Sequence, residues 1–290
     1  MELTCGPILL AFLPFPLRKL LATLAAALTL LLAPAAPLHA QASTGQPYTG
    51  PRFPGGPDSL RALLSRASRH AASPVTGRML VQFELKADGQ PTNLTLIRPP
   101  APLNKPLVEA TARALDYIEA HMPAWQPALP TPQSSPTKPV PITLLVDFPA
   151  PDAPVLPYAY ADESPVFGTL SDLLRQQRPL DTYVKKLLAD PEQVAKLQTT
   201  PEGLIRVLQM LVRYPPEALR AREQGIVYAH VEIAENGTIV QREVLGSAGR
   251  ALDAEVRRVL ALLPNATSPA RLHGQPMRLS CVVPMTFRVL

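Results

Sequence analysis

The side chains that could do chemistry are few and scattered along the chain. His70, His121, His230 and His273 stand apart, with no HxxxH, HExxH or Cys/His spacing that would gather ligands around a metal ion. The sequence also contains no G-x-S-x-G, no G-x-G-x-x-G and no phosphate-binding loop. These absences predict a protein that is not an enzyme, with no catalytic residues, no metal and no cofactor.

Three single residues carry structural expectations instead. Cys281 lies in an apolar extended stretch and is expected to be a small buried side chain of a strand. Trp125 follows an amphipathic helix and is expected to close a hydrophobic core. His230 alternates with the apolar side chains of its strand, so we expect it at a solvent-facing or rim position.

Residues 1–42 are typical of an export signal. A basic pair precedes an apolar run at 20–32, and prolines and small residues follow. This order predicts a signal peptide cleaved after Ala40 or Ala42, which leaves one thiol and no internal disulfide in the mature chain. The alternative is an uncleaved anchor in the inner membrane, because residues 20–38 approach the roughly 20 residues that span a bilayer.

Charge gives little support for a nucleic-acid partner. The formal net charge is +5, but Lys and Arg are interspersed with acids and form no run that would follow a phosphate backbone. We therefore expect no nucleic acid among the partners.

Two stretches of the chain share one strand pattern. Residues 77–89 read GRMLVQFELKADG and residues 225–237 read GIVYAHVEIAENG. Apolar side chains at alternate positions predict a strand with one buried face, and the closing Asp-Gly and Asn-Gly predict tight hairpin turns into second strands at 92–98 and 239–246. The apolar positions are Met79, Val81, Phe83 and Leu85 in one stretch, and Val227, Ala229, Val231 and Ile233 in the other.

A helix and a last strand follow each hairpin. Apolar residues at helical spacing predict helices over 103–114 and 252–263. Extended stretches at 139–148 and 276–290 complete each unit, and Pro284 predicts that the second is an edge strand or carries a bulge. The predicted fold is α+β, with two tandem β-β-α-β units, each a small antiparallel sheet packed on a helix.

Helical sequence precedes each unit. One helix is expected at 57–71, and a longer helical region at 170–212 contains the N-cap pattern Thr200-Pro201. Between the units, residues 149–165 are rich in proline and are expected to form an extended, stiff linker.

The second unit resembles the C-terminal domain of TonB, a periplasmic protein that transmits inner-membrane energy to outer-membrane transporters. A Tyr-Pro pair, an alanine, two glycines, a leucine and a closing PMTF occur in the family's order. These are Tyr214, Pro215, Ala218, Gly225, Gly237, Leu252 and residues 284–287.

The first unit resembles a degenerate copy of the same domain. It has the FPGG phrase at 53–56, which is similar to TonB-like proteins of Bacteroidetes, and a Trp-x-Pro-Ala at 125–128, but it lacks the Tyr-Pro. The expected organisation is a signal peptide or anchor (1–42), a first TonB C-terminal-like domain (43–148), a linker (149–165), a helical segment (166–212) and a second such domain (213–290).

The resemblance implies a periplasmic TonB-like protein that binds envelope partners, including an outer-membrane receptor in energy-coupled transport, by strand addition. The alternative is an envelope adaptor without energy coupling, because residues 20–38 hold no Ser and no long Pro-Lys or Pro-Glu spacer is present. The resemblance places partner binding at the last strand and the Tyr-Pro beside it, whose other possible role is to brace the sheet. The candidate residues are Arg213, Tyr214, Pro215, Arg278, Ser280 and Val282.

Overall fold

The computed structural model describes residues 45–71, 75–128, 139–150, 156–177, 179 and 181–289. Thr44–Leu290 form one compact unit. The expected signal peptide or anchor at 1–42 therefore lies outside the described residues.

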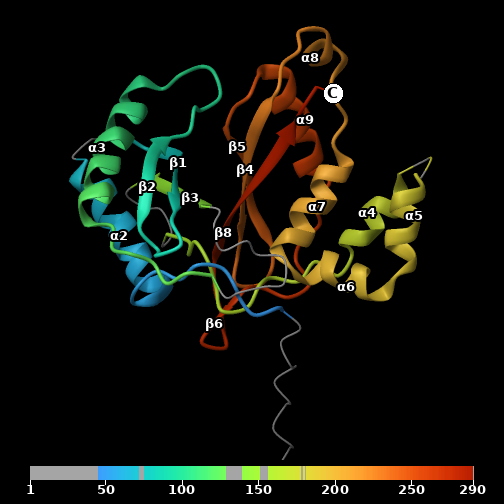
Figure 1. Ribbon diagram of the computed structural model, residues 1–290, viewed down its shortest axis with the longest axis horizontal. Helices are drawn as coiled ribbons and strands as arrows, with labels where there is room; N and C mark the ends of the chain where they lie inside the picture. Colours follow the sequence, from blue (N-terminus) through green and yellow to red (C-terminus); the bar gives the residue numbers. More distant parts are fainter. Residues whose placement is uncertain are drawn as a thin grey trace, which may run out of the picture. The chain divides into compact units, whose positions relative to one another are not determined.

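The first half of the unit is a three-stranded antiparallel sheet with two helices on one face (Figure 1). The strand order is β2-β1-β3, so the hairpin β1–β2 is extended by the strand that follows the helix α3. The elements are α2 (Gly56–His70), β1 (Gly77–Leu85), β2 (Pro91–Leu96), α3 (Lys105–His121) and β3 (Val140–Phe148).

The second half repeats this connectivity. Its sheet has the order β5-β4-β8, with the helix α9 between the hairpin and the last strand, and a two-stranded hairpin β6–β7 inserted before β8. The predicted mixed α+β fold with small antiparallel sheets is thus confirmed. The strands and this helix are β4 (Gly225–Ile233), β5 (Ile239–Gly246), α9 (Arg250–Ala261), β6 (Arg271–Leu272), β7 (Gln275–Pro276) and β8 (Leu279–Phe287).

The helical region before the second sheet is divided into short helices. Asp190 caps the helix that starts at Pro191, and Thr200 caps the helix that starts at Pro201 by accepting a hydrogen bond from the Gly203 amide. Because proline fits the first turn of a helix but not its interior, each proline ends the preceding helix and starts the next. The helices are α4 (Leu170–Gln176), α5 (Thr182–Ala189), α6 (Pro191–Thr199), α7 (Pro201–Leu211) and α8 (Pro216–Arg220).

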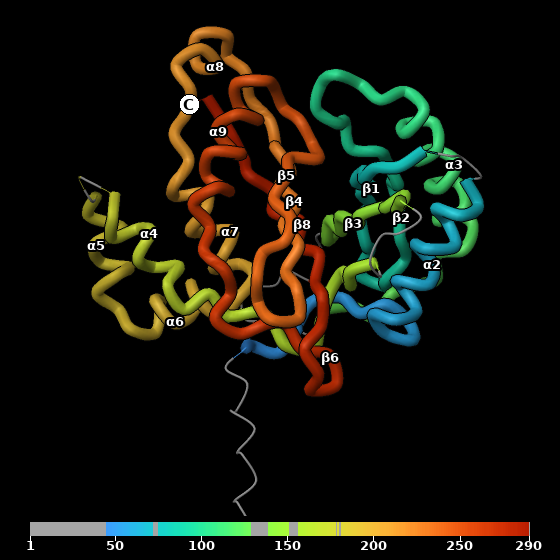
Figure 2. The backbone as a smooth tube through the Cα atoms, turned by 180° about the vertical axis from the view of Figure 1, so that it is seen from behind, coloured from blue at the N-terminus to red at the C-terminus, as the bar shows by residue number. Residues whose placement is uncertain are grey.

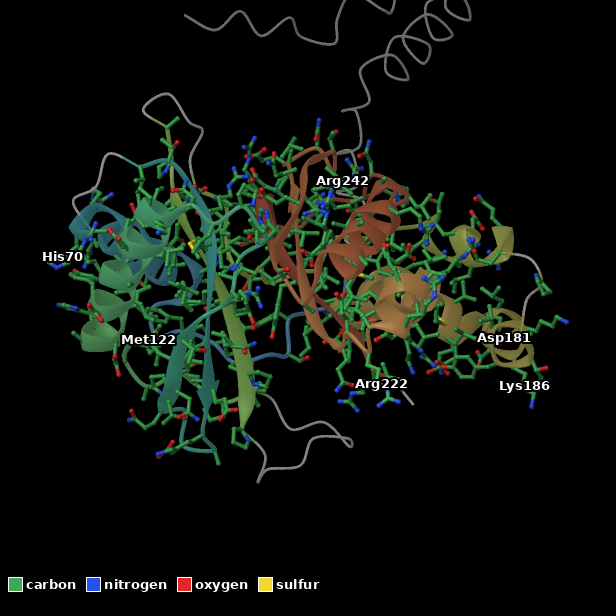
Figure 3. The ribbon with its side chains drawn as sticks, turned by 90° about the horizontal axis from the view of Figure 1, so that it is seen from above. His70, Met122, Asp181, Lys186, Arg222 and Arg242 are labelled. Carbon is green, nitrogen blue, oxygen red and sulfur yellow. The ribbon has the colours of Figure 1, made fainter. Side chains whose placement is uncertain are left out.

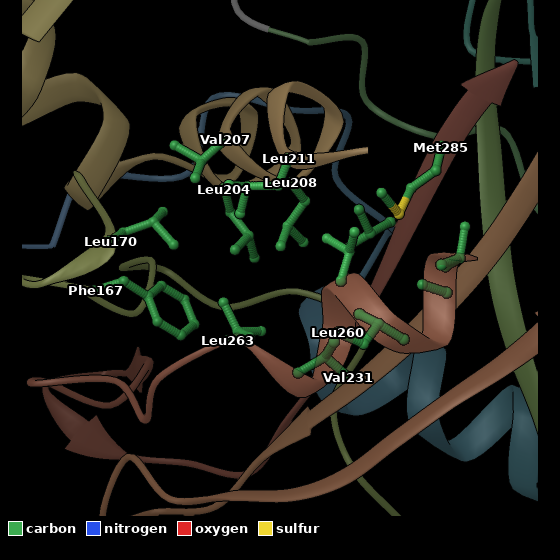
Figure 4. Close-up of a cluster of buried hydrophobic side chains, with 14 of the residues drawn as sticks. Phe167, Leu170, Leu204, Val207, Leu208, Leu211, Val231, Leu260, Leu263 and Met285 are labelled. Atoms are coloured by element: carbon green, nitrogen blue, oxygen red, sulfur yellow. The ribbon is translucent and has the colours of Figure 1, made fainter. Parts of the chain in front are cut away.

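Each sheet buries the apolar face that the sequence predicts. Every one of the eight alternating positions is buried. Trp125 is 3% exposed and packs edge-on against Phe53, with ring centroids 5.4 Å apart, which confirms its predicted place in the core. In the second half, side chains of α7, α9 and the sheet form one cluster that includes Leu208, Val231 and Met285 (Figure 4).

The opposite faces of the two sheets are turned toward each other, and their side chains fill the layer between them (Figure 3). Leu80 of β1 and His230 of β4 are both 0% exposed in this layer. The expectation that His230 lies at a solvent-facing or rim position is therefore wrong. The polar positions of its strand face a second sheet instead of water.

The two hairpin turns have the same hydrogen bonds. In the first, the Gly89 amide donates to the Lys86 carbonyl, and the Trp125 amide donates to the Gly89 carbonyl at 2.9 Å. In the second, the Gly237 amide donates to the Ala234 carbonyl, and the Ala266 amide donates to the Gly237 carbonyl at 2.9 Å. Each turn thus binds the segment that follows the helix of its own half.

Candidate binding site along the β8 edge

The strand β8 is the outer strand of its sheet. One of its edges pairs with β4, and its other edge is the outer edge of the sheet. This confirms the edge position predicted from Pro284. Backbone groups of a strand alternate in direction, and the Ser280 and Thr286 amides both donate away from β4. By the same alternation Val282 presents its N–H and C=O outward, whereas Pro284 has no N–H to offer.

Both ends of this outer edge are covered. At one end the Tyr158 amide donates to the Arg278 carbonyl at 3.0 Å, and the Ser280 amide donates to the Tyr158 carbonyl at 2.8 Å. At the other end the Gln209 side chain of α7 accepts from the Thr286 amide and donates to its carbonyl, both at 2.9 Å. Among the described residues, no hydrogen bond reaches the outward backbone groups of Val282.

A cavity of about 280 Å³ opens beside Val282, between β8, β3 and α7. Figure 2 shows β3 and β8 next to each other from behind the molecule. The lining has no charged side chain among the described residues, and four hydroxyls from Thr and Ser interrupt its apolar surface. The apolar lining includes Leu145, Tyr160, Phe167, Leu204, Ile205 and Val283.

The titratable groups of the lining are held in their neutral forms. Burial raises the pKa of the Tyr48 phenol, and burial likewise raises the pKa of Tyr160. Burial raises the pKa of the Cys281 thiol to about 12, although the residue as a whole is only half-buried. Since these groups stay protonated near neutral pH, the cavity suits an apolar side chain rather than an ion.

A charged cluster joins the two sheets in the layer between them. Arg78 of β1 lies 3.2 Å from Asp147 on β3, 3.0 Å from Glu243 on β5 and 3.6 Å from Glu232 on β4. His230 Nδ1 is 3.0 Å from Glu243. The Arg78 side chain therefore contacts carboxylates of three strands at once.

The pKa values of two of these carboxylates are shifted in opposite directions. Burial would raise the pKa of Glu243, but hydrogen bonds from His230 and Arg78 outweigh it and hold that pKa below its ordinary value. At Asp147 burial is the stronger effect and raises the pKa despite the nearby Arg78 guanidinium.

Of the candidate residues near this edge, Ser280 and Val282 belong to β8, and Arg278 immediately precedes it. Ser280 and Val282 line the cavity, and the Ser280 hydroxyl is 2.9 Å from His230 Nε2. The Arg278 side chain is directed to Glu232 at 3.1 Å and to Glu235 at 3.7 Å. The arginine is thus engaged within its own sheet.

The candidate residues around the Tyr-Pro lie at the other end of β8. The Tyr214 ring packs edge-on against Phe287, with centroids 5.6 Å apart, and its hydroxyl donates to the Glu223 carbonyl. The Arg213 amide donates to Glu255 at 2.7 Å. A nine-residue strand spans roughly 27 Å, so Arg213, Tyr214 and Pro215 do not lie beside Arg278 as expected.

Tyr158 and Gln209 are functional candidates that the sequence did not indicate. Tyr158 falls in a proline-rich stretch, and Gln209 is one polar residue of an apolar helix. Neither position has a spacing that distinguishes it from a solvent-exposed residue, because both contacts join segments distant in the chain.

Comparison with known proteins agrees with this architecture. Two strands, a helix and a last edge strand form a small antiparallel α+β domain. Residues 211–289 match the family model of the Gram-negative bacterial TonB protein C-terminal. Comparison with curated proteins and with solved structures gave no match. Within the described residues, no helix has the length and apolar character needed to cross a membrane.

Proposed function

We propose that this chain is a TonB-like protein of the periplasm that binds an extended segment of an envelope partner, such as an outer-membrane receptor, by strand addition at Val282. The observation that carries the proposal is the family match over residues 211–289, whose last strand is β8. The outward N–H and C=O of Val282 supply main-chain hydrogen bonds to the partner segment. The adjacent cavity receives one side chain of the partner.

We also propose that residues 43–148 are a diverged copy of the domain at 213–290. The two halves have the same strand order and the same helix position. Their hairpin turns make the same hydrogen bonds, in which Trp125 and Ala266 take equivalent positions. This arrangement is the expected product of a duplication followed by the loss of different family residues from each half.

A pull-down from envelope extract tests the binding proposal. The bait is residues 44–290, because a shorter fragment would expose the buried charged layer. The Val282→Pro variant removes the outward N–H without removing a bond to β4, so we expect loss of the captured partner with an unchanged Tm. Val240→Pro, which removes an outward N–H from the other edge strand of the same sheet, β5, is the matched control and retains capture.

Different results contradict different parts of the binding proposal. If the wild-type bait captures no envelope protein, binding itself is excluded. Equal capture by Val282→Pro excludes this edge as the site, and loss of capture in Arg213→Glu instead would place the contact at the Tyr-Pro end.

A second candidate function is an envelope adaptor that does not couple to an energy source. Backbone pairing within the folded unit already includes Gln46, whose carbonyl accepts a hydrogen bond from the Ser164 amide at 3.0 Å. The sequence between the apolar run at 20–32 and this contact contains no Pro-Lys or Pro-Glu repeat of the kind that spans the periplasm. In-cell photocrosslinking from position 282 separates the two functions, since an adaptor keeps its crosslink after a protonophore collapses the proton gradient.

A further inference from the structure

The segment that covers the start of the β8 edge is itself held by the first half of the protein. Tyr158 forms a parallel bridge with Leu279 through two backbone hydrogen bonds. Its hydroxyl donates to Asp58 on α2 at 2.8 Å, and the Arg61 guanidinium lies 4.0 Å from its ring centroid. Asp58 and Arg61 also pair with each other at 3.2 Å.

The position of Tyr158 limits what can be added at Val282. Strand addition uses successive outward groups along one edge, and the next outward group toward the start of β8 is the Ser280 amide. That amide already donates to the Tyr158 carbonyl. A partner segment longer than the free stretch must therefore displace Tyr158.

The covalent connection favours the internal contact. Residues after Tyr158 are fixed to β6 by hydrogen bonds of the Asp162 and Glu163 amides to the Arg271 carbonyl. A segment tethered this closely competes at a high effective concentration, without any additional contact. Loss of the side-chain contacts between Tyr158 and α2 lowers the fraction of molecules in which Tyr158 covers the β8 edge. The backbone N–H and C=O of Tyr158 are still present in those molecules.

We propose that residues 156–158 are an intramolecular competitor for the partner-binding edge of β8, and that Asp58 and Arg61 of α2 hold Tyr158 in place. This inference rests on the proposed strand addition at β8. It makes the first half of the protein a regulator of the second, since any contact that withdraws α2 from Tyr158 frees the edge.

Amide hydrogen exchange in the purified full chain tests the competitor without any partner. Tyr158→Ala removes both contacts with α2, and we expect about tenfold faster exchange of the Ser280 amide. The Thr286 amide, held by Gln209 on the same strand, should be unchanged. Tyr183→Ala is the matched control, because Tyr183 also contacts an arginine, Arg206, but away from this edge.

The inference is overturned if Ser280 exchanges at the wild-type rate in Tyr158→Ala. If Tyr158→Ala accelerates amide exchange at Ser280 and Thr286 alike, the Asp58→Ala variant tests the inference instead. Asp58 is exposed, and its loss should accelerate exchange of the Ser280 amide alone, by about threefold. An unchanged rate in that variant also overturns the inference.

A synthetic peptide of residues 156–161, LPYAYA, separates this inference from the proposed function. Added to Tyr158→Ala, it should shift the Ser280 and Val282 amide resonances with about tenfold tighter apparent affinity than in wild type. If it shifts neither resonance in either protein, strand addition at this edge fails, while the exchange result still decides whether residues 156–158 are held by α2.

Discussion

Gly237 lies so close to Ala266 that a Cβ added to the glycine would be 2.5 Å from the Ala266 carbonyl oxygen. The same relationship holds in the first half, where a Cβ on Gly89 would be 1.9 Å from the Trp125 carbonyl oxygen. The two glycines have φ values of 84° and 81°, in the left-handed region. Close approach and backbone conformation together require glycine at both turns.

Alanine at either glycine should therefore destabilise the protein. Gly237→Ala and Gly89→Ala each incur the left-handed penalty of about 1–2 kcal/mol and a backbone clash that must be relieved, so we expect a total loss of about 3 kcal/mol in urea unfolding. Gly274→Ala is the control, because Gly274 has a φ of 76° but no atom within 4 Å of an added Cβ. Equal losses at all three positions would contradict the role of the close approach.

The elements of this fold follow from local patterns in the sequence. Alternating apolar residues define β1 and β4, and helical spacing defines α3 and α9, because one face of each must be buried. Pro284 predicts either an edge strand or a bulge, and β8 is an edge strand.

The assembly of the two halves does not follow from these patterns. A strand with one polar face has the same alternating sequence whether that face contacts water or the polar side chains of another sheet. The sequence therefore does not predict the burial of His230. The Tyr158 bridge joins a proline-rich segment to a distant strand, and no local preference encodes such a contact. The separation of Tyr214 from Arg278 likewise depends on the direction in which β8 runs.

Loss of Arg78 should destabilise the contact between the sheets. Arg78→Met leaves the carboxylates of Asp147 and Glu243 without their common partner, and Glu232, whose side chain is 5% exposed, keeps only Arg278. We expect a loss of about 3 kcal/mol in urea unfolding. Lys196→Met, which breaks an exposed pair with Glu192, should cost less than about 0.5 kcal/mol. Similar small effects from both variants would show that the cluster contributes nothing to stability.

Acid unfolding should depend on Glu243 and Asp147 with opposite signs. The lowered pKa of Glu243 gives stability that is present above its ordinary value of 4.5 and is lost as the pH falls through its pKa in the folded protein. Glu243→Gln should therefore flatten the fall of unfolding free energy below about pH 5. The pKa of Asp147 is raised, so its protonation relieves a burial cost on acidification. Asp147→Asn should steepen the same fall, and a common direction for both variants would contradict the assignment.

Cys281 should be unreactive in the folded protein. Burial raises the pKa of its thiol to about 12, and the thiolate is the species that reacts with alkylating reagents. At pH 8 we expect residues 44–290 to react with iodoacetamide about a thousandfold more slowly than an exposed cysteine of pKa about 8.5. Val240→Cys in a Cys281→Ala background is the matched control, because Val240 is 46% exposed on β5. Guanidinium should bring Cys281 to the control rate, and rapid labelling of Cys281 in the native protein would show that the cavity beside β8 admits water and reagent to the sulfur.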